Sequence, residues 1–302
     1  MDYPIPDSAR TQLYYSKGQW RDETILQRMA VHIRTLPDKL AVRDANGYDL
    51  TYRELNAQSD RLAGFLSVHG IGPGDVLTIC QPNWTQTVVV FLAAFKLGAV
   101  INPVPVTYGR AELTFVMEKC QSKALFIAGR FRSTDFTQAV AQMPNTLMQG
   151  LTIVRLGDGA NEVGTPWGSA LTYAPLLKAH AGHANDPAAV LFTSGTESRA
   201  KGGVHTHNTI LFGERALADA LDISSDDVAF MASPIAHATG FLHGVVMTLT
   251  TGGTLSLLDV FEGAAAARQM HAHGYTNFNT MRTVTFLIAG KLNFKKFNAH
   301  AA

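Results

Sequence analysis

Cysteine is scarce in this chain of 302 residues, which contains only Cys80 and Cys120. The two do not form a Cys-x-x-Cys pair, so the sequence offers neither a disulfide framework nor a cysteine-based zinc site. We expect both thiols to be buried, in a protein of a reducing compartment.

Net charge is also nearly absent. The chain has 25 Lys and Arg residues against 24 Asp and Glu residues, which leaves a formal charge of +1. This balance provides no basic field for nucleic acid or for an anionic membrane, so neither is expected as a partner. The composition, with 46% hydrophobic residues, 26 Gly and 12 Pro, is typical of a globular chain with one large or two ordinary domains.

Long hydrophobic runs are missing as well. The longest apolar stretch, near residues 87–106, is broken by Lys96, Gly98 and Pro103, so no segment is expected to span a bilayer. Residues 1–20 are polar and of mixed charge, unlike a signal or transit peptide. These features predict a soluble, cytoplasmic protein.

Short apolar runs alternate with amphipathic segments from residue 40 onward. Alternating strands and helices favour an α/β fold with mostly parallel sheets flanked by helices, here in two packed subdomains. We expect an N-terminal α/β subdomain over 1–185, a second over 186–281 and a divergent tail over 282–302. The expected strands cover 40–44, 48–52, 75–81, 99–102, 124–128, 151–156, 188–192, 228–232, 254–258 and 276–279, and the expected helices 51–69, 83–98, 110–120, 208–221, 241–249 and 262–273.

Local signals set three of these boundaries. Asn46-Gly47 is a strong hairpin turn signal between the first two strands. Thr51 and Glu54 have the spacing of a capping box that opens a helix. Asn83 is predicted to cap the helix that runs to Gly98.

A segment rich in glycine and hydroxyl groups follows the strand at 188–192. Such a segment is suited to hold phosphate, because glycines let backbone N–H groups approach an anion, hydroxyls donate further hydrogen bonds and a lysine adds positive charge. A plain turn needs only one or two such residues. The residues concerned are Thr193, Ser194, Gly195, Thr196, Lys201, Gly202 and Gly203.

The P-loop of NTPases does not fit this segment. That motif requires glycine before its lysine and a hydroxyl residue after it, whereas Ala200 precedes Lys201 and Gly202 follows it. Ser194 also lacks the Gly-x-Ser-x-Gly surroundings of a hydrolase nucleophile.

The segment resembles the phosphate loop of the AMP-forming acyl-CoA synthetases, Thr-Ser-Gly-Thr-Thr-Gly-x-Pro-Lys-Gly followed by Thr-His or Ser-His. Residues 193–196, 201–202 and 206–207 match it, while Glu197, Ser198 and Ala200 depart from it. Further similar motifs occur in the family's order at 51–55, 72–77, 96–103, 233–244 and 257–259. The resemblance covers roughly residues 20–281 and is nearest to the medium- and short-chain fatty acid CoA ligases.

The resemblance implies a two-step ligase. The carboxylate attacks the α-phosphate of ATP and releases pyrophosphate, and the thiol of CoA then cleaves the acyl-adenylate. Lys201 and His237 are the implied catalytic residues; no residue is assigned to a metal. ATP, CoA and Mg²⁺ are the implied cofactors, and a short- or medium-chain fatty acid is the implied substrate. The implied phosphate-binding residues are Thr193, Ser194, Gly195, Thr196, Lys201 and Gly202, and the implied acyl-pocket residues are His237, Gly240 and Phe241.

The histidines of these segments also have simpler structural interpretations. A histidine in an apolar segment is more often a core residue, and only the family's matching His-x-x-Gly position favours a site role for His237. His205 and His207 share one face of an expected strand and suit zinc by spacing. Neither a Cys nor a carboxylate cluster supports zinc there, and the family uses none.

Several family motifs are missing. These are the Tyr-Gly-x-Thr-Glu and Thr-Gly-Asp segments that serve magnesium and ribose, and the C-terminal domain with its adenylation lysine. We therefore expect an incomplete N-terminal portion of a ligase, in which the sequence departs from the family pattern at about Arg282. Two alternatives remain: an inactive nucleotide- or acyl-binding remnant, and an enzyme that adenylates an aryl or amino acid.

Overall fold

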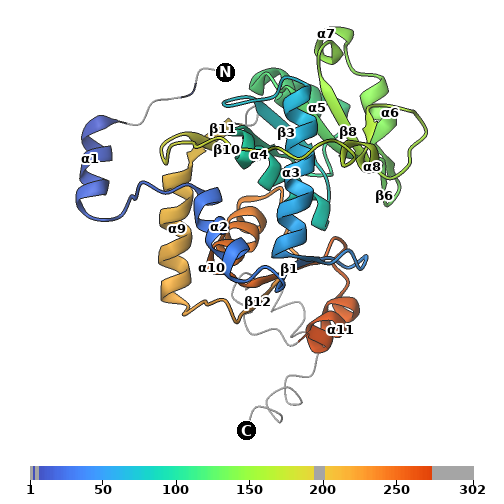
Figure 1. Cartoon of the computed structure of the whole chain (residues 1–302). Helices are drawn as coiled ribbons and strands as arrows, with labels where there is room; N and C mark the ends of the chain where they lie inside the picture. The colour runs from blue at the N-terminus through green and yellow to red at the C-terminus, as the bar shows by residue number, and fades with distance from the viewer. Residues whose placement is uncertain (1–2, 4–6, 194–200, 274–302) are drawn as a thin grey trace.

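The computed structural model describes residue 3 and residues 7–193 and 201–273. Within them, two sheets and their covering helices form the α/β architecture that the alternating sequence predicts (Figure 1). None of the described helices is long and apolar enough to cross a membrane.

The larger sheet has seven strands in the order β11-β10-β4-β3-β5-β8-β9. Neighbouring strands are parallel except β10 and β11, which form an antiparallel pair. The strands are β3 (Val76–Cys80), β4 (Val100–Pro103), β5 (Ala124–Ala128), β8 (Thr152–Leu156), β9 (Thr165–Pro166), β10 (Pro187–Thr193) and β11 (Lys201–Thr206).

The smaller sheet has four strands in the order β12-β13-β1-β2. The predicted hairpin joins β1 and β2 in antiparallel pairing, while β13 runs parallel to both β1 and β12. Each sheet thus takes strands from both sides of residue 185, and the division into subdomains at that point stays a prediction. The strands are β1 (Leu40–Arg43), β2 (Leu50–Thr51), β12 (Val228–Met231) and β13 (Thr254–Leu257), and a separate short ribbon contains β6 (Arg130–Phe131) and β7 (Thr134–Asp135).

The helices cover both sheets. In Figure 1 the helix α3 runs through the centre of the molecule, and α10 packs against both α2 and α9. The helices are α1 (Ser8–Ser16), α2 (Ile25–Thr35), α3 (Tyr52–Val68), α4 (Thr85–Leu97), α5 (Arg110–Cys120), α6 (Phe136–Ala141), α7 (Asn145–Met148), α8 (Trp167–Ala170), α9 (His207–Ala220), the π-helix η1 (Thr239–Val246), α10 (Met247–Thr251) and α11 (Gly263–His273).

One continuous hydrophobic core joins the two sheets. It contains Leu77 and Ile101 of the larger sheet, Val42 and Leu255 of the smaller sheet, and Phe91 of α4. Almost every residue of α4 is buried, which agrees with its place in the longest apolar stretch of the chain. The sheets therefore cannot separate without exposing this shared core.

The start of α4 corrects one prediction. Thr51 caps α3 with the expected Glu54 capping box, but Asn83 does not cap α4. The helix begins at Thr85, and the backbone N–H of Thr85 donates to Asp44 Oδ2 at 3.0 Å. The carboxylate of Asp44, which is distant in sequence, therefore accepts from the first turn of α4, as the local pattern predicted for Asn83.

The two cysteines agree with the prediction. Both are free and buried. Burial raises the pKa of Cys80 to about 12 and that of Cys120 to about 11, so both remain protonated at neutral pH.

Candidate functional site

The predicted phosphate loop leaves the carboxyl end of β10, where α/β proteins commonly bind ligands. Antiparallel pairing of β10 and β11 sets Thr193 opposite Lys201, so the two ends of the loop lie side by side. Ser194, Gly195 and Thr196 lie outside the described residues. The structure therefore shows how the loop's ends are held, and the roles of these three residues stay predictions.

Strand β11 begins with a lysine followed by two glycines. Lys201 is exposed at the beginning of the strand. A Cβ atom at Gly202 would lie 3.0 Å from Val190 Cγ1 and 3.2 Å from Phe192 Cζ. A larger residue at 202 would therefore crowd the side chains of β10 and require them to shift by a few tenths of an ångström.

The predicted acyl-pocket residues lie in the segment that follows β12 and begins the π-helix η1. His237 is exposed, and its Nδ1 accepts the backbone N–H of Thr239 at 3.3 Å. At Gly240 a Cβ would stand 2.2 Å from the carbonyl oxygen of Pro234, so only glycine allows this turn. Phe241 is fully buried and packs edge-on against Phe91 with ring centroids 5.4 Å apart. Gly240 and Phe241 therefore anchor the segment in the core and leave His237 at its surface.

Asn83 ties this segment to the larger sheet. It follows β3 and is 4% exposed. Its Nδ2 donates to the carbonyl oxygens of Ser233 at 2.8 Å and Leu258 at 3.1 Å, and its Oδ1 accepts the N–H of Ile235 at 2.8 Å. Because β3, β12 and β13 all end here, one amide side chain joins the carboxyl ends of both sheets. The sequence predicted a helix cap instead, although an amide residue within three positions of an apolar strand end is a usable signal for this role.

A second connection lies next to it. The indole Nε1 of Trp84 donates to Asp259 Oδ2 at 2.8 Å, and Asp259 follows β13. Asp44, which follows β1, accepts from Thr85 through Oδ2 and from the backbone N–H groups of Asn46 and Tyr48 through Oδ1. Lys201 lies at the carboxyl end of β10 in the larger sheet. His237 follows the strand ends of the smaller sheet, which residues 83–85 hold in place through these hydrogen bonds.

A buried carboxylate supports the π-helix from the side of α9. Glu214 is 4% exposed, and its Oε2 lies 3.0 Å from Nδ1 of His243 in η1. The hydrogen bond to Glu214 raises the pKa of His243. π-Helical turns are often found at functional sites, and here the pair fixes the helix that begins beside His237.

The zinc interpretation of His205 and His207 gains no support. His207 opens α9 rather than lying in a strand, and its Nδ1 accepts the backbone N–H of Ile25 at 3.3 Å. In the part of the chain that the structure describes, no three His, Cys, Asp or Glu side chains gather as a metal site would. The structure also assembles no set of described residues for the Mg²⁺ that accompanies ATP.

Comparison with known proteins agrees with this geometry. The fold is that of the N-terminal part of adenylate-forming enzymes: it superimposes on the apo structure of MbtA from Mycobacterium smegmatis with a TM-score of 0.80 and 27% identity, covering 91% of this chain and 51% of MbtA. An anthranilate CoA ligase, AuaEII, shares the fold at a TM-score of 0.77 and 16% identity, over 84% of this chain and 49% of that one.

The sequence places the chain more narrowly. The profile of the AMP-binding enzyme family matches residues 29–301, so the chain belongs to that family. The match includes most of the segment 282–302 that we expected to diverge, which lies outside the described residues. The medium-chain fatty-acid–CoA ligase of Escherichia coli K12 is 36% identical over 262 residues, which cover 84% of this chain and 45% of that enzyme. The chain thus spans about half the length of the curated relatives it matches.

Proposed function

We propose that this chain carries the ATP-phosphate site and part of the acyl site of an AMP-forming carboxylate–CoA ligase that acts on a short- or medium-chain fatty acid. The observation that supports it most is the 36% identity to the medium-chain fatty-acid–CoA ligase of E. coli. The strand ends that carry Lys201 and the His237 segment support the same function.

The residues present fit the triphosphate of ATP. The β10–β11 pair presents Lys201 at the ligand edge of the sheet, and Gly202 and Gly203 follow it without side chains. In the proposed site Thr193, Ser194, Gly195, Thr196 and Gly202 hold β- and γ-phosphate oxygens, and Lys201 offsets their charge. Such positioning and charge neutralisation is what adenylation requires of a protein.

The acyl side of the site rests on the segment fixed by Asn83. His237 lies at its surface, while Gly240 and Phe241 are its buried support. In the proposed site His237 stands between the carboxylate and the nucleotide. Gly240 and Phe241 set the wall of the acyl pocket from behind, through the contact of Phe241 with Phe91.

Binding of acyl-adenylate mimics tests both the site and its substrate class. Non-hydrolysable sulfamoyl-adenosine mimics carrying octanoyl, benzoyl or leucyl groups would be titrated into the purified chain by calorimetry. We expect the octanoyl compound to bind at least about tenfold more tightly than the other two, because the extra methylene groups are buried. Tighter binding of the benzoyl or leucyl compound contradicts the fatty acid proposal, and absence of all binding contradicts the proposed site.

Turnover is a separate measurement on the same preparation. We expect the 302-residue chain alone to form no octanoyl-CoA from octanoate, ATP, Mg²⁺ and CoA. Sustained thioester formation by this chain would overturn that expectation and exclude the alternative of an inactive remnant.

A further inference from the structure

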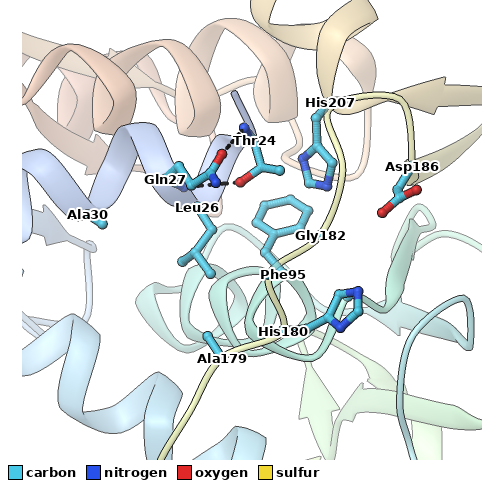
Figure 2. Close-up of a pocket in the computed structure, with 12 residues that line it drawn as sticks. Thr24, Leu26, Gln27, Ala30, Phe95, Ala179, His180, Gly182, Asp186 and His207 are labelled. Carbon is cyan, nitrogen blue, oxygen red and sulfur yellow. Dashed lines mark hydrogen bonds between the residues drawn. The ribbon is translucent and has the colours of Figure 1, made fainter. Parts of the chain in front are cut away.

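A cavity of about 240 Å³ lies where α2, the end of α4, residues 179–186 and the start of α9 meet (Figure 2). We refer to it as the α2–α4 cavity. Phe95 and Gly98 in its lining precede β4, and Asp186 precedes β10. The cavity is therefore at the amino ends of these strands, at the edge of the larger sheet opposite to Lys201, and is separate from the candidate ligase site.

The walls of the α2–α4 cavity are largely apolar. Leu26 and Ala30 line it from α2, the buried ring of Phe95 from α4, and Ala179 from the loop. A cavity of about 150 Å³ with such walls holds a benzene molecule. The α2–α4 cavity therefore has room for one aromatic ring with a short substituent.

The imidazole of His207 points into this space. His207 is 6% exposed, and Figure 2 shows its ring directed into the cavity near Phe95. Its Nδ1 accepts the N–H of Ile25, so in the neutral ring the proton sits on Nε2. Burial lowers the pKa of His207 to about 4, and the ring is neutral at pH 7. Among the described residues, none accepts a hydrogen bond from Nε2.

The charge around the cavity limits what that donor can hold. Asp186 lines the cavity, and its negative charge partly opposes the lowering of the His207 pKa by burial. The lining contains no Lys or Arg to offset a bound anion. A bound carboxylate or phosphate would therefore be repelled by Asp186, without a lysine or arginine in the lining to compensate.

We infer that the α2–α4 cavity is a second binding site, for a small uncharged aromatic compound with a carbonyl oxygen. The ring would lie against Phe95, Leu26 and Ala30, and the carbonyl oxygen would accept the Nε2–H of His207. An occupant of this kind gives the Nε2–H of His207 an acceptor and excludes water from the apolar walls.

Three probes of nearly equal size test this inference: benzamide, ethylbenzene and benzoate. Each would be titrated into the ¹⁵N-labelled chain at pH 7, with the backbone amides of α2 and the imidazole nitrogens of His207 followed by NMR. We expect benzamide to saturate these shifts with an affinity about tenfold above that of ethylbenzene, the value of one good hydrogen bond, and benzoate not to saturate them.

Variants separate the cavity from its donor. Ala30→Leu fills the space and should abolish binding of benzamide, whereas Ala57→Leu, on the exposed surface of α3, should leave it unchanged. His207→Asn keeps an acceptor where Nδ1 accepts from Ile25, removes the ring donor and should erase the preference for benzamide over ethylbenzene. Benzamide binding that survives Ala30→Leu, a preference that survives His207→Asn, or benzoate that binds as tightly as benzamide would each overturn the inference.

Discussion

Asn83 and Ile235 are joined by a hydrogen bond of 2.8 Å from the Ile235 backbone N–H to the Asn83 Oδ1, although 152 residues separate them in sequence. The same side chain donates to Ser233 and Leu258. This contact fixes the segment that leads to His237 relative to β3 of the larger sheet. It therefore holds the segment before His237 at the carboxyl end of β3, in the same sheet that carries Lys201.

Replacement of Asn83 should therefore be costly. Asn83→Ala leaves the Ile235 N–H and the two carbonyl groups buried without their partner, which we expect to lower the free energy of unfolding by about 3 kcal/mol. Asn83→Asp should cost at least as much, because a carboxylate would face the carbonyl oxygens of Ser233 and Leu258. Urea unfolding measures both, with Asn145→Ala on an exposed position as the control. A loss near that of the control would show that Asn83 does not hold the segment.

The ion pair of Lys96 with Asp60 should respond unequally to loss of its two partners. The Lys96 ammonium is almost fully buried and donates to Asp60 Oδ1 at 2.6 Å and to Asn56 Oδ1 at 2.9 Å. Removing Asp60 strands this charge, so Asp60→Ala should cost about 3 kcal/mol, and Lys96→Met clearly less.

The exposed pair of Arg53 with Asp38 is the matched control, since both side chains are largely in solvent. We expect Asp38→Ala to cost below about 0.5 kcal/mol in the same urea experiment. If Lys96→Met proved more destabilising than Asp60→Ala, the buried ammonium would not be the dominant cost.

The comparison of sequence with structure shows where local patterns suffice. The Thr51–Glu54 capping box lies within one helical turn, and the structure confirms it. The prediction that Asn83 caps α4 was wrong, because Asp44, which follows another strand, accepts the backbone N–H of Thr85. Likewise, the apolar pattern predicts a helix at 241–249 but gives no sign of its π-helical start, where Gly240 lies close against Pro234. Contacts between strand ends distant in sequence decide these points, and periodicity does not record them.

Stability should also depend on pH through His243. Its hydrogen bond to Glu214 raises the pKa of the folded state above the ordinary value of 6.5. This contribution is therefore fully present below pH 6.5 and is lost as the pH rises through the folded-state pKa. It should amount to no more than about 1 kcal/mol, because the His243 side chain is partly exposed and screened by water.

Glu214→Gln tests this dependence. The difference in unfolding free energy between wild type and variant should be larger at pH 5.5 than at pH 9, and the NMR titration of His243 should move to lower pH in the variant. Glu118→Gln, at an exposed position of α5, should change neither quantity. A difference that grows with pH would reverse the sign and refute the assignment.

Lys201 offers a way to separate the phosphate part of the proposed site from the acyl part. It is exposed at the beginning of β11, beside the loop that is proposed to hold the β- and γ-phosphates. ATP has these phosphates, whereas the octanoyl sulfamoyl-adenosine mimic has none of them. Lys201→Ala should therefore weaken ATP binding by at least about tenfold, the loss expected for a charge-assisted hydrogen bond, and change binding of the mimic by less than about twofold.

NMR titrations of both ligands at low and high salt measure this difference, and Lys119→Ala on the exposed face of α5 is the matched control. The loss of ATP affinity should shrink as salt rises, because screening weakens the contact of Lys201 with phosphate. Equal loss for ATP and the mimic would mean that Lys201 supports the fold of the loop rather than the phosphates, since a structural defect affects both ligands alike.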